Sequence, residues 1–344
     1  MQDFGKIMAS EIAQTPKVFE NILANISDIQ KVRDVLKSRD IKSVLILARG
    51  TSDNAAHYLK YLIETQIGLP VGLTSPSAVS IYNSKLMYEN TLIVAISQSG
   101  QSTDLIRFAK AAKDSGAYLL AMTNNPSSPL ASLSDHHLNL HAGPELAVAA
   151  TKSYSAQLLT SYLLVLTWTD KNIDVLKVIS ETSRLALEPN LISPTLSKLN
   201  RNHELVFLGR GFAYPNAREA ALKIQETNRI SVQAYSTADY LHGPISALTS
   251  DTQVFFVAPS HSPYESISDA VKKIRETTKN IFWIGNGGKI EPGEVHLGGS
   301  NCNDEITSTI ADAVVLQRLA LEFAVKEGFN PDAPEGLSKV TLTI

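Results

Sequence analysis

The segment Leu47-Ala48-Arg49-Gly50 ends a run of aliphatic residues and is followed by a helical stretch that reaches Glu64. The same order returns as Leu208-Gly209-Arg210-Gly211, followed by a helical stretch that reaches Glu226, at an offset of 161 to 162 residues. Because a strand, a glycine turn and a helix recur together at one long offset, the sequence predicts a duplicated α/β unit.

A second piece of the chain repeats in nearly the same register. Ile93-Val94-Ala95 leads into a serine-rich turn, and Phe256-Val257-Ala258 leads into another one at an offset of 163 residues. In the first copy we expect strands at residues 43–48, 92–97 and 118–123, with helix-length segments between them. Near-continuous apolar strands separated by helices are typical of parallel sheets that are covered on both faces. The predicted fold class is therefore α/β, with two similar lobes.

The chain is expected to divide into a helical lead-in, two lobes and a tail. The predicted boundaries are residues 1–40 for the lead-in, 41–192 for the first lobe, 193–329 for the second lobe and 330–344 for the tail. Residues 151–187 are expected to form a long helical region, and their most apolar part, 158–168, is about half of the ~20 residues that a membrane span needs. Residues 158–168 are therefore predicted to be a buried helix. The linker between the lobes is expected near residues 189–194, a stretch bounded by prolines.

The composition limits the partners and the compartment. Of the 344 residues, 44% are hydrophobic and 19% are charged, and the formal net charge is −3. No basic block could neutralise a run of phosphates, so we expect neither a nucleic-acid nor a membrane partner. Cys302 is the single cysteine, which excludes a disulfide framework and fits a reducing, cytoplasmic compartment. We expect Cys302 to be unreactive packing, and residues 1–10 do not read as a signal peptide.

Two polar turns could bind an anion. Ser97-Gln98-Ser99-Gly100-Gln101-Ser102 lies between a predicted strand and a predicted helix, and Arg49-Gly50-Thr51-Ser52-Asp53 has the same context. Hydroxyl and N–H groups at a helix N-terminus form an anion site, and glycine lets the backbone approach the anion. No Walker lysine or G-x-G-x-x-G follows, which favours a phosphorylated small molecule over a nucleotide. The alternative is that these hydroxyl groups only cap helices.

The matching helix of the second lobe carries charges instead. Glu219, Lys223 and Glu226 are spaced i, i+4 and i+7, which places them on one helix face. The alternative is a solvated ion pair, but apolar residues between them predict a largely buried helix, in which charges are costly. His242 precedes a Gly-Pro turn, and Lys339 lies in a turn-rich tail. Taken alone, each of these two is interpreted as an exposed loop residue.

Together these motifs resemble the sugar isomerase (SIS) family, specifically the isomerase half of glutamine–fructose-6-phosphate aminotransferase. The resemblance runs from residues 8–16 nearly to the end of the chain, and it also includes Ala142-Gly143-Pro144-Glu145 and Ala150-Thr151-Lys152. It implies two tandem SIS lobes, each a flavodoxin-like parallel sheet between helical layers, with N-terminal helices and an ordered C-terminal tail. It also implies a homodimer that binds a hexose or hexosamine 6-phosphate, with no metal and no cofactor.

The resemblance assigns a role to each site residue. The sugar phosphate would be bound by Thr51, Ser52, Ser97, Gln98, Ser99 and Ser102. The rest of the substrate pocket would include Gly50, Gly100, Val148, Ala149 and Ser338. Glu226 would move a proton between C1 and C2 of the open-chain sugar, with Lys223 and Glu219 beside it. His242 of a neighbouring subunit would help to open the ring, and Lys339 would approach the carbonyl end, where it could form an imine.

Departures from the synthase pattern favour a different reaction. Met1 and Gln2 stand about where the isomerase half begins, so no glutaminase domain is expected. Gln101-Ser102 replaces Glu-Thr, the turn at Arg49 differs from its Cys-Gly-Thr-Ser-Tyr-like counterpart, and the ending Lys339-Val340-Thr341 looks like that of SIS-type glucosamine-6-phosphate deaminases. The predicted reaction is therefore conversion of glucosamine 6-phosphate to fructose 6-phosphate and ammonia.

Other activities stay open within the same resemblance. They are a phosphosugar isomerase that does not deaminate, an ammonia-dependent synthase, a fructosamine-phosphate deglycase and a non-catalytic phosphosugar sensor. The absence of a helix-turn-helix extension and the retention of Glu226, His242 and Lys339 argue against the sensor.

Overall fold

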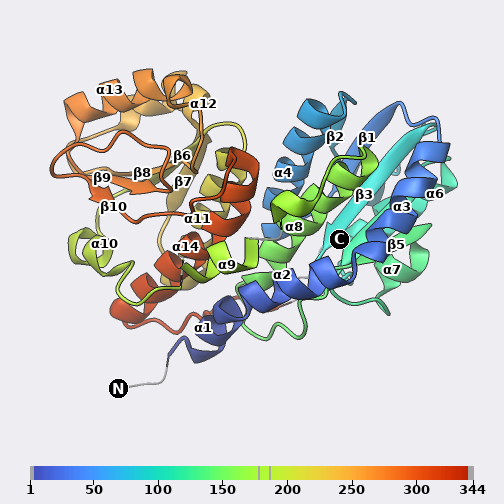
Figure 1. The fold of residues 1–344 in the computed structure, drawn as a ribbon, viewed down its shortest axis with the longest axis horizontal. Coiled ribbons are helices and arrows are strands. Elements are labelled where there is room, and N and C mark those ends of the chain that lie inside the picture. Colours follow the sequence, from blue (N-terminus) through green and yellow to red (C-terminus); the bar gives the residue numbers. More distant parts are fainter. Residues whose placement is uncertain (1–3, 177–178, 186, 340–344) are drawn as a thin grey trace. The chain divides into compact units, whose positions relative to one another are not determined.

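The computed structural model describes residues 4–176, 179–185 and 187–339, and its ribbon is drawn in Figure 1. The chain forms two compact units. The sheet A unit comprises residues 17–145, 152–174 and 338–344, and the sheet B unit comprises residues 1–16, 146–151 and 175–337. Residues 340–344 of the predicted tail lie outside the described residues, and so do the last two residues of the Lys339-Val340-Thr341 motif.

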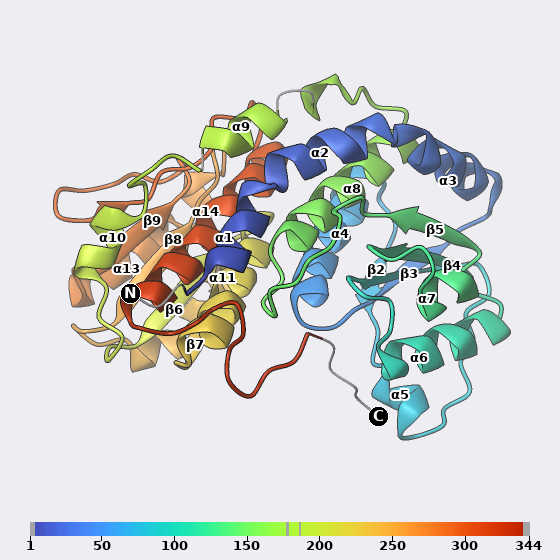
Figure 2. The same ribbon diagram turned by 90° about the horizontal axis from the view of Figure 1, so that it is seen from below.

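The sheet A unit is built on five parallel strands in the order β2-β1-β3-β4-β5. These are β1 (Ser43–Leu47), β2 (Val71–Leu73), β3 (Thr91–Ser97), β4 (Tyr118–Thr123) and β5 (His136–Asn139). One face is covered by α6 (Thr103–Asp114) and α7 (Pro129–Leu133), whose apolar side chains pack against Ile93, Ala95 and Leu119. On the other face Figure 2 shows α3 (Ile26–Ser38), α4 (Thr51–Gln66) and α8 (Lys152–Trp168).

The sheet B unit repeats this design. Its parallel strands are β6 (Leu205–Gly209), β7 (Val232–Ser236), β8 (Gln253–Val257), β9 (Ile281–Ile284) and β10 (Val295–His296), in the order β10-β9-β8-β6-β7. One face packs on α11 (Ala213–Asn228) and α14 (Glu305–Lys326) through Phe207, Phe255 and Phe282. The other face packs on α12 (Thr237–Leu241) and α13 (Ser268–Thr277) through Phe256 and Trp283.

The predicted duplication is confirmed. Counted from the first strand of each sheet, the two strand orders are the same, and both have the flavodoxin-like order. Helices α4 and α11 each have 16 residues, and their first residues, Thr51 and Ala213, are 162 positions apart. Strand β4 has the predicted bounds, whereas β1 ends one residue earlier and β3 begins one residue earlier than expected.

The helical lead-in is confirmed as α1 (Lys6–Ala13), α2 (Thr15–Ala24) and α3. The long helical region predicted over residues 151–187 is divided into separate helical elements. Helix α8 ends at Trp168 because Asp170 adopts a left-handed conformation with φ 54°, and the Lys171 N–H donates to the Leu166 carbonyl at 2.8 Å. A 3-10 turn (Asp174–Leu176) and α9 (Ile179–Leu185) follow. The apolar part of α8 is buried as predicted.

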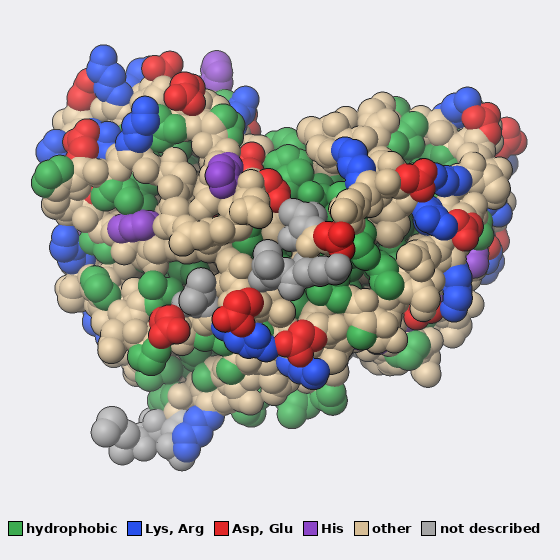
Figure 3. Space-filling view, in the orientation of Figure 1, with side chains coloured by type: hydrophobic (Ala, Val, Ile, Leu, Met, Phe, Trp, Pro, Cys, Tyr) green, Lys and Arg blue, Asp and Glu red, His purple; other side chains and the backbone are tan. Residues whose placement is uncertain are grey.

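The remaining helical elements are short: α5 (Ser77–Ser80), α10 (Ser193–Lys198), and 3-10 turns at Pro244–Ala247 and Tyr264–Ser266. In the part of the chain that the structure describes, no helix combines the length and the apolar character needed to cross a membrane. Acidic and basic side chains are interspersed over the face drawn in Figure 3.

Candidate functional site

The two predicted phosphate turns meet at one edge of sheet A. Strands β1 and β3 are neighbours, with Leu47 paired to Ala95, and the chain leaves them in opposite directions across the sheet. Such a switch point is where open α/β sheets bind ligands. The Arg49 Nε donates to the buried Asp104 carboxylate at 3.0 Å, which links the turn before α4 to the first turn of α6.

The serines in these turns are not helix caps. The residue before α6 is Ser102, and its side chain makes no capping hydrogen bond; the residue before α4 is Gly50, which has no side chain to cap with. Elsewhere in the chain, Ser128 does cap its helix, because its Oγ accepts the Ala131 N–H at 3.3 Å. The capping interpretation of Ser102 is therefore wrong, and its hydroxyl group can serve a ligand.

The hydroxyl groups of the Ser97 loop shape the loop and keep their hydrogens available. The Ser97 Oγ accepts the Gly100 N–H at 3.1 Å, and the Ser99 Oγ accepts the Gln101 N–H at 3.3 Å. Among the described residues neither hydroxyl group has an acceptor for its own hydrogen. The Ser52 Oγ accepts from the buried Gln157 amide at 2.9 Å. Two O–H donors at a helix N-terminus suit a phosphate dianion.

Gly100 is required by both conformation and space. Its φ of 65° is left-handed, and a Cβ there would lie 2.2 Å from the Ser128 Oγ. Gly50 is also left-handed, with φ 56°, but no atom lies within 4 Å of its virtual Cβ, so conformation alone explains that glycine. The carbonyl of Gln98 accepts the Asn124 N–H at 3.0 Å, which ties the loop to the end of β4.

In the matching loop of the sheet B unit, the hydroxyl hydrogens are not available to a ligand. The Ser260 hydroxyl donates to the Ser300 carbonyl at 2.6 Å, and the Ser262 hydroxyl donates to Glu305 Oε1 at 3.1 Å. Burial raises the pKa of Glu305, although the Ser262 hydroxyl opposes the shift. Both hydroxyl hydrogens are used within the protein, so only the sheet A copy of the loop offers its hydroxyl groups to an anion.

Helix α11 brings the three predicted charged residues together. The side chains of Glu219 and Lys223 are 1% and 0% exposed, and that of Glu226 is 24% exposed. The Lys223 Nζ lies 3.6 Å from Glu219 Oε1 and forms an ion pair with Glu226 Oε2. A solvated ion pair is therefore excluded. Glu226 is the member of the group that solvent or a substrate can reach.

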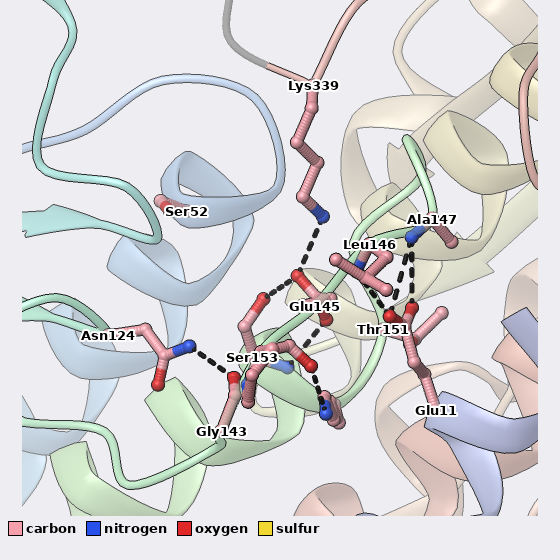
Figure 4. A network of polar contacts seen from close by, with 12 residues as sticks. Glu11, Ser52, Asn124, Gly143, Glu145, Leu146, Ala147, Thr151, Ser153 and Lys339 are labelled. Carbon is pink, nitrogen blue, oxygen red and sulfur yellow. Dashed lines mark hydrogen bonds and ion pairs between the residues drawn. The ribbon is translucent and has the colours of Figure 1, made fainter. Parts of the chain in front are cut away.

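Lys339 is held by a carboxylate to which the sequence reasoning gave no role. Its Nζ donates to Glu145 Oε2 at 2.9 Å, and Glu145 also accepts the Ser153 N–H at 3.0 Å and the Ser153 hydroxyl at 2.7 Å. Figure 4 shows Lys339 and Ser153 directed at the Glu145 carboxylate, whose side chain is fully buried. The sequence signal for Glu145 is the Gly143-Pro144-Glu145 motif. The motif alone does not indicate that its carboxylate binds a residue far along the chain.

The other predicted residues are placed individually. His242 follows the last residue of α12 and is exposed, and its ring forms no hydrogen bond or ion pair with the described residues. Val148 is half-buried and Ala149 is buried, in the segment of the sheet B unit at residues 146–151. Ser338 is exposed beside Lys339. No group of three or more His, Cys, Asp or Glu side chains suited to a metal ion occurs in the described ranges.

Within each unit the structure groups these residues as follows. The sheet A unit contains Gly50, Thr51, Ser52, Ser97, Gln98, Ser99, Gly100, Ser102, Ser338 and Lys339. The sheet B unit contains Val148, Ala149, Glu219, Lys223, Glu226 and His242. The hydroxyl donors thus belong to one unit and the candidate base to the other.

This arrangement is that of the SIS domain family. The sequence model of the SIS domain matches residues 38–167 and 198–287, which is more than half of the chain, so the chain belongs to this family. A curated relative, the isomerizing glutamine–fructose-6-phosphate aminotransferase of Pyrococcus horikoshii, is 30% identical over 96% of this chain and 57% of its own length. The chain thus spans a little over half of that relative, and the predicted resemblance to the isomerase half is confirmed.

Solved structures give the same fold. A protein of Silicibacter pomeroyi DSS-3, described as a candidate phosphosugar isomerase, is 30% identical with a TM-score of 0.82, over 95% of this chain and 99% of that one. The glucosamine-6-phosphate deaminase of Thermotoga maritima is 23% identical with a TM-score of 0.80, over 98% of this chain and 99% of that one, which shows the shared fold alone.

Proposed function

We propose that this chain converts glucosamine 6-phosphate and water to fructose 6-phosphate and ammonia. The observation that carries the proposal is the α11 group, in which a partly exposed Glu226 is ion-paired to a fully buried lysine. A carboxylate fixed beside a buried cation, on a helix that otherwise packs into the core, is suited to accept a proton from carbon and return it.

Substrate binding is assigned to the hydroxyl groups of the sheet A unit. The phosphate would accept hydrogen bonds from Ser97 and Ser99, with Thr51, Ser52, Gln98 and Ser102 completing the anion site. The phosphate is remote from the reacting carbons, so its binding energy would serve to position C1 and C2. The contrast with Ser260 and Ser262, which donate within the protein, supports this choice of loop.

The chemistry needs a proton transfer from C2 to C1, a proton shift from nitrogen to oxygen, and one hydrolysis. In the open-chain aldose, Glu226 removes the C2 proton, the electron pair forms the C1–C2 double bond, and the C1 oxygen takes up a proton, which gives an enolamine. Return of the first proton to C1, with loss of a proton from the amino nitrogen, gives a C1 hydroxyl group and the C2 imine. Water adds to that imine, the C–N bond breaks, and ammonia leaves a C2 ketone. Lys223 holds Glu226 in place, and the Lys339 ammonium stabilises the oxygen charge that develops at C1.

The names of the relatives support this class of reaction. One relative is named as acting on fructose 6-phosphate, and one structural neighbour is named as a glucosamine-6-phosphate deaminase. Both names describe chemistry at the C1 and C2 end of a hexose 6-phosphate. An isomerase that does not deaminate is the outcome if fructose 6-phosphate forms from glucose 6-phosphate alone.

The direct test is a product assay with the purified chain. Glucosamine 6-phosphate should yield ammonia and fructose 6-phosphate in equal amounts, and Glu226→Gln should lower kcat by ~10²- to 10⁴-fold, the contribution of a positioned base. Glu322→Gln is the matched control, because Glu322 accepts from Arg318 at 2.7 Å on α14 of the same unit and has no assigned role. Absence of ammonia from any hexosamine phosphate would reject the deaminase.

The role proposed for His242 requires a second subunit. His242→Asn and Glu226→Gln proteins should each be inactive alone, and mixing them in equal amounts after partial dissociation should restore about a quarter of wild-type activity. Half of randomly mixed dimers contain both variants, and each mixed dimer has one intact site. No recovery, with exchange of subunits demonstrated, would place His242 and Glu226 in the same protomer's site.

A further inference from the structure

Helix α1 lies outside the segments that match the SIS domain, but it is built into the sheet B unit. Met8 and Ile12 are buried, and α1 packs against α14, beside which it is drawn in Figure 2. At its start, Gly5 has φ 76°, and a Cβ there would lie 2.6 Å from the Leu321 side chain and 3.2 Å from that of Pro331. The helix begins in close contact with the C-terminal tail.

The buried carboxylate of Glu11 holds the segment that carries Val148 and Ala149. Its two oxygens accept the Ala147 N–H at 3.4 and 3.3 Å, and one of them also accepts the Leu146 N–H, as Figure 4 shows. Leu146 is 71% exposed, whereas Ala147 is buried in the hydrophobic core, so packing holds only one of the two residues that Glu11 binds. Glu11 adds charge-assisted hydrogen bonds to the backbone of both residues.

The other end of α1 is held by the tail. The Asp332 carboxylate accepts the Ile7 N–H at 3.3 Å and the Met8 N–H at 2.8 Å, in the first turn of a helix whose own preceding residue provides no side-chain cap. A carboxylate at this position also interacts favourably with the helix dipole. The backbone carbonyl of Asp332 in turn accepts the Val148 N–H at 3.1 Å.

These contacts close a triangle of three segments that are far apart in sequence. Helix α1 binds residues 146–147 through Glu11, Asp332 binds α1, and Asp332 also binds Val148. We propose that α1 is a clamp that holds the Val148–Ala149 segment and the tail in one fixed arrangement, with Glu11 and Asp332 as positioning residues. The kinetic part of this inference rests on the proposed function, because Val148 and Ala149 line the assigned pocket and the tail leads on to Lys339.

The test of the clamp is hydrogen exchange in the full chain. Glu11→Gln keeps the shape of the side chain but replaces one acceptor oxygen with an amino group. Asp332→Asn does the same at the other corner. Losing a charge-assisted bond should raise the exchange rates of the bonded amides by about ten- to a hundred-fold. The clamp predicts that each substitution also accelerates exchange at the corner it does not touch: Met8 for Glu11→Gln, and Leu146 and Ala147 for Asp332→Asn.

The matched control is Asp304→Asn. Asp304 caps α14 by accepting the Thr307 N–H at 2.8 Å, in the same unit but away from the clamp. It should destabilise its own helix and leave exchange at Met8, Leu146, Ala147 and Val148 unchanged. If Glu11→Gln and Asp332→Asn each accelerate only the amides bonded to the replaced carboxylate, the three contacts are independent and the clamp is wrong.

The values of KM and kcat distinguish a positioning role of Glu11 and Asp332 from a purely stabilising one. Glu11→Gln should raise the KM for glucosamine 6-phosphate by about ten-fold and Asp332→Asn should lower kcat by a similar factor, whereas a purely structural role would only reduce the folded fraction. Glu11→Asp, which retains the charge, should have a KM between those of Glu11→Gln and the wild-type chain. If the wild-type chain turns over no hexosamine phosphate, the proposed function fails, and the exchange experiment still decides the clamp.

Discussion

The buried carboxyl group of Asp312 predicts how the stability of the sheet B unit depends on pH. It lies on α14 and is fully buried, and its Oδ1 accepts the Ser300 N–H at 2.5 Å. Its Oδ2 has no hydrogen-bond partner within the described residues. Burial raises the pKa of Asp312 from 3.8 to about 7, although the hydrogen bonds from Ser300 oppose the shift.

The magnitude follows from the two pKa values. Below the unfolded pKa of 3.8 the carboxyl is protonated in both states and contributes no difference. Between that pH and about 7 the folded state keeps the proton that the unfolded state has lost, so the free energy of unfolding falls by about 1.4 kcal/mol per pH unit. The loss reaches about 4 kcal/mol and is complete above the folded pKa. Stability is therefore lost as the pH rises.

Asp312→Asn removes this titration without changing the shape of the side chain. Urea unfolding of both proteins should be followed from pH 4 to pH 8 in a Trp168→Phe background. Trp283, buried in β9, then reports on the sheet B unit alone. Other titrating groups are common to both proteins, so the difference between their free energies of unfolding isolates Asp312.

Relative to Asp312→Asn, the parent protein should lose about 4 kcal/mol across this range, with a slope that flattens above pH 7. Infrared spectra at pH 5.5 should contain a protonated carboxyl band that the variant lacks. Two curves that run parallel from pH 4 to pH 8, together with identical infrared spectra, would mean that Asp312 is ionised in the folded protein and that the argument from burial fails.

Three further predictions concern single contacts. Gly100→Ala should raise the KM for the sugar phosphate at least ten-fold with a smaller effect on kcat, because its Cβ would meet the Ser128 hydroxyl; an unchanged KM would remove this loop from the phosphate site. Lys339→Met should destabilise the sheet A unit by about 3 kcal/mol because it removes a cationic donor from the buried Glu145 carboxylate, and Glu145→Gln should cost less because Lys339 is 24% exposed; equal losses in urea unfolding would contradict this asymmetry. Burial raises the pKa of Cys302, so iodoacetamide should alkylate it at least a hundred-fold more slowly in the folded protein than in urea, and comparable rates would show that the thiol is accessible.

The fold could be predicted because its signals are local and repeated. The central strands are apolar runs, and the offset of about 162 residues aligns two copies that support each other. The break after α8 could not be predicted in this way. The residues after Trp168 are compatible with a helix, and α8 ends there because Asp170 adopts the left-handed conformation, which helical spacing does not encode.

The site was predictable where its residues are neighbours in sequence. The Ser97 loop and the α11 group depend on spacing alone, and the structure brings each of them together. Glu145 and Asp332 act on residues far along the chain, and a single sequence holds no signal for a contact of that kind. The hydrogen bonds that Ser260 and Ser262 donate within the protein could not be predicted for the same reason, since their acceptors lie on other segments.

The duplication itself explains what distinguishes Glu226. At the offset of 162 between α4 and α11, Glu226 corresponds to Glu64 and Lys223 corresponds to Tyr61. Glu64 pairs with Lys60 in a partly solvated i,i+4 ion pair, of the kind that contributes little. Glu226 has instead a lysine three residues earlier that is fully buried and also faces Glu219. The carboxylate at this position forms a partly solvated ion pair on α4 and a pair with a buried lysine on α11, and the two helices differ because α11 has Lys223 where α4 has Tyr61.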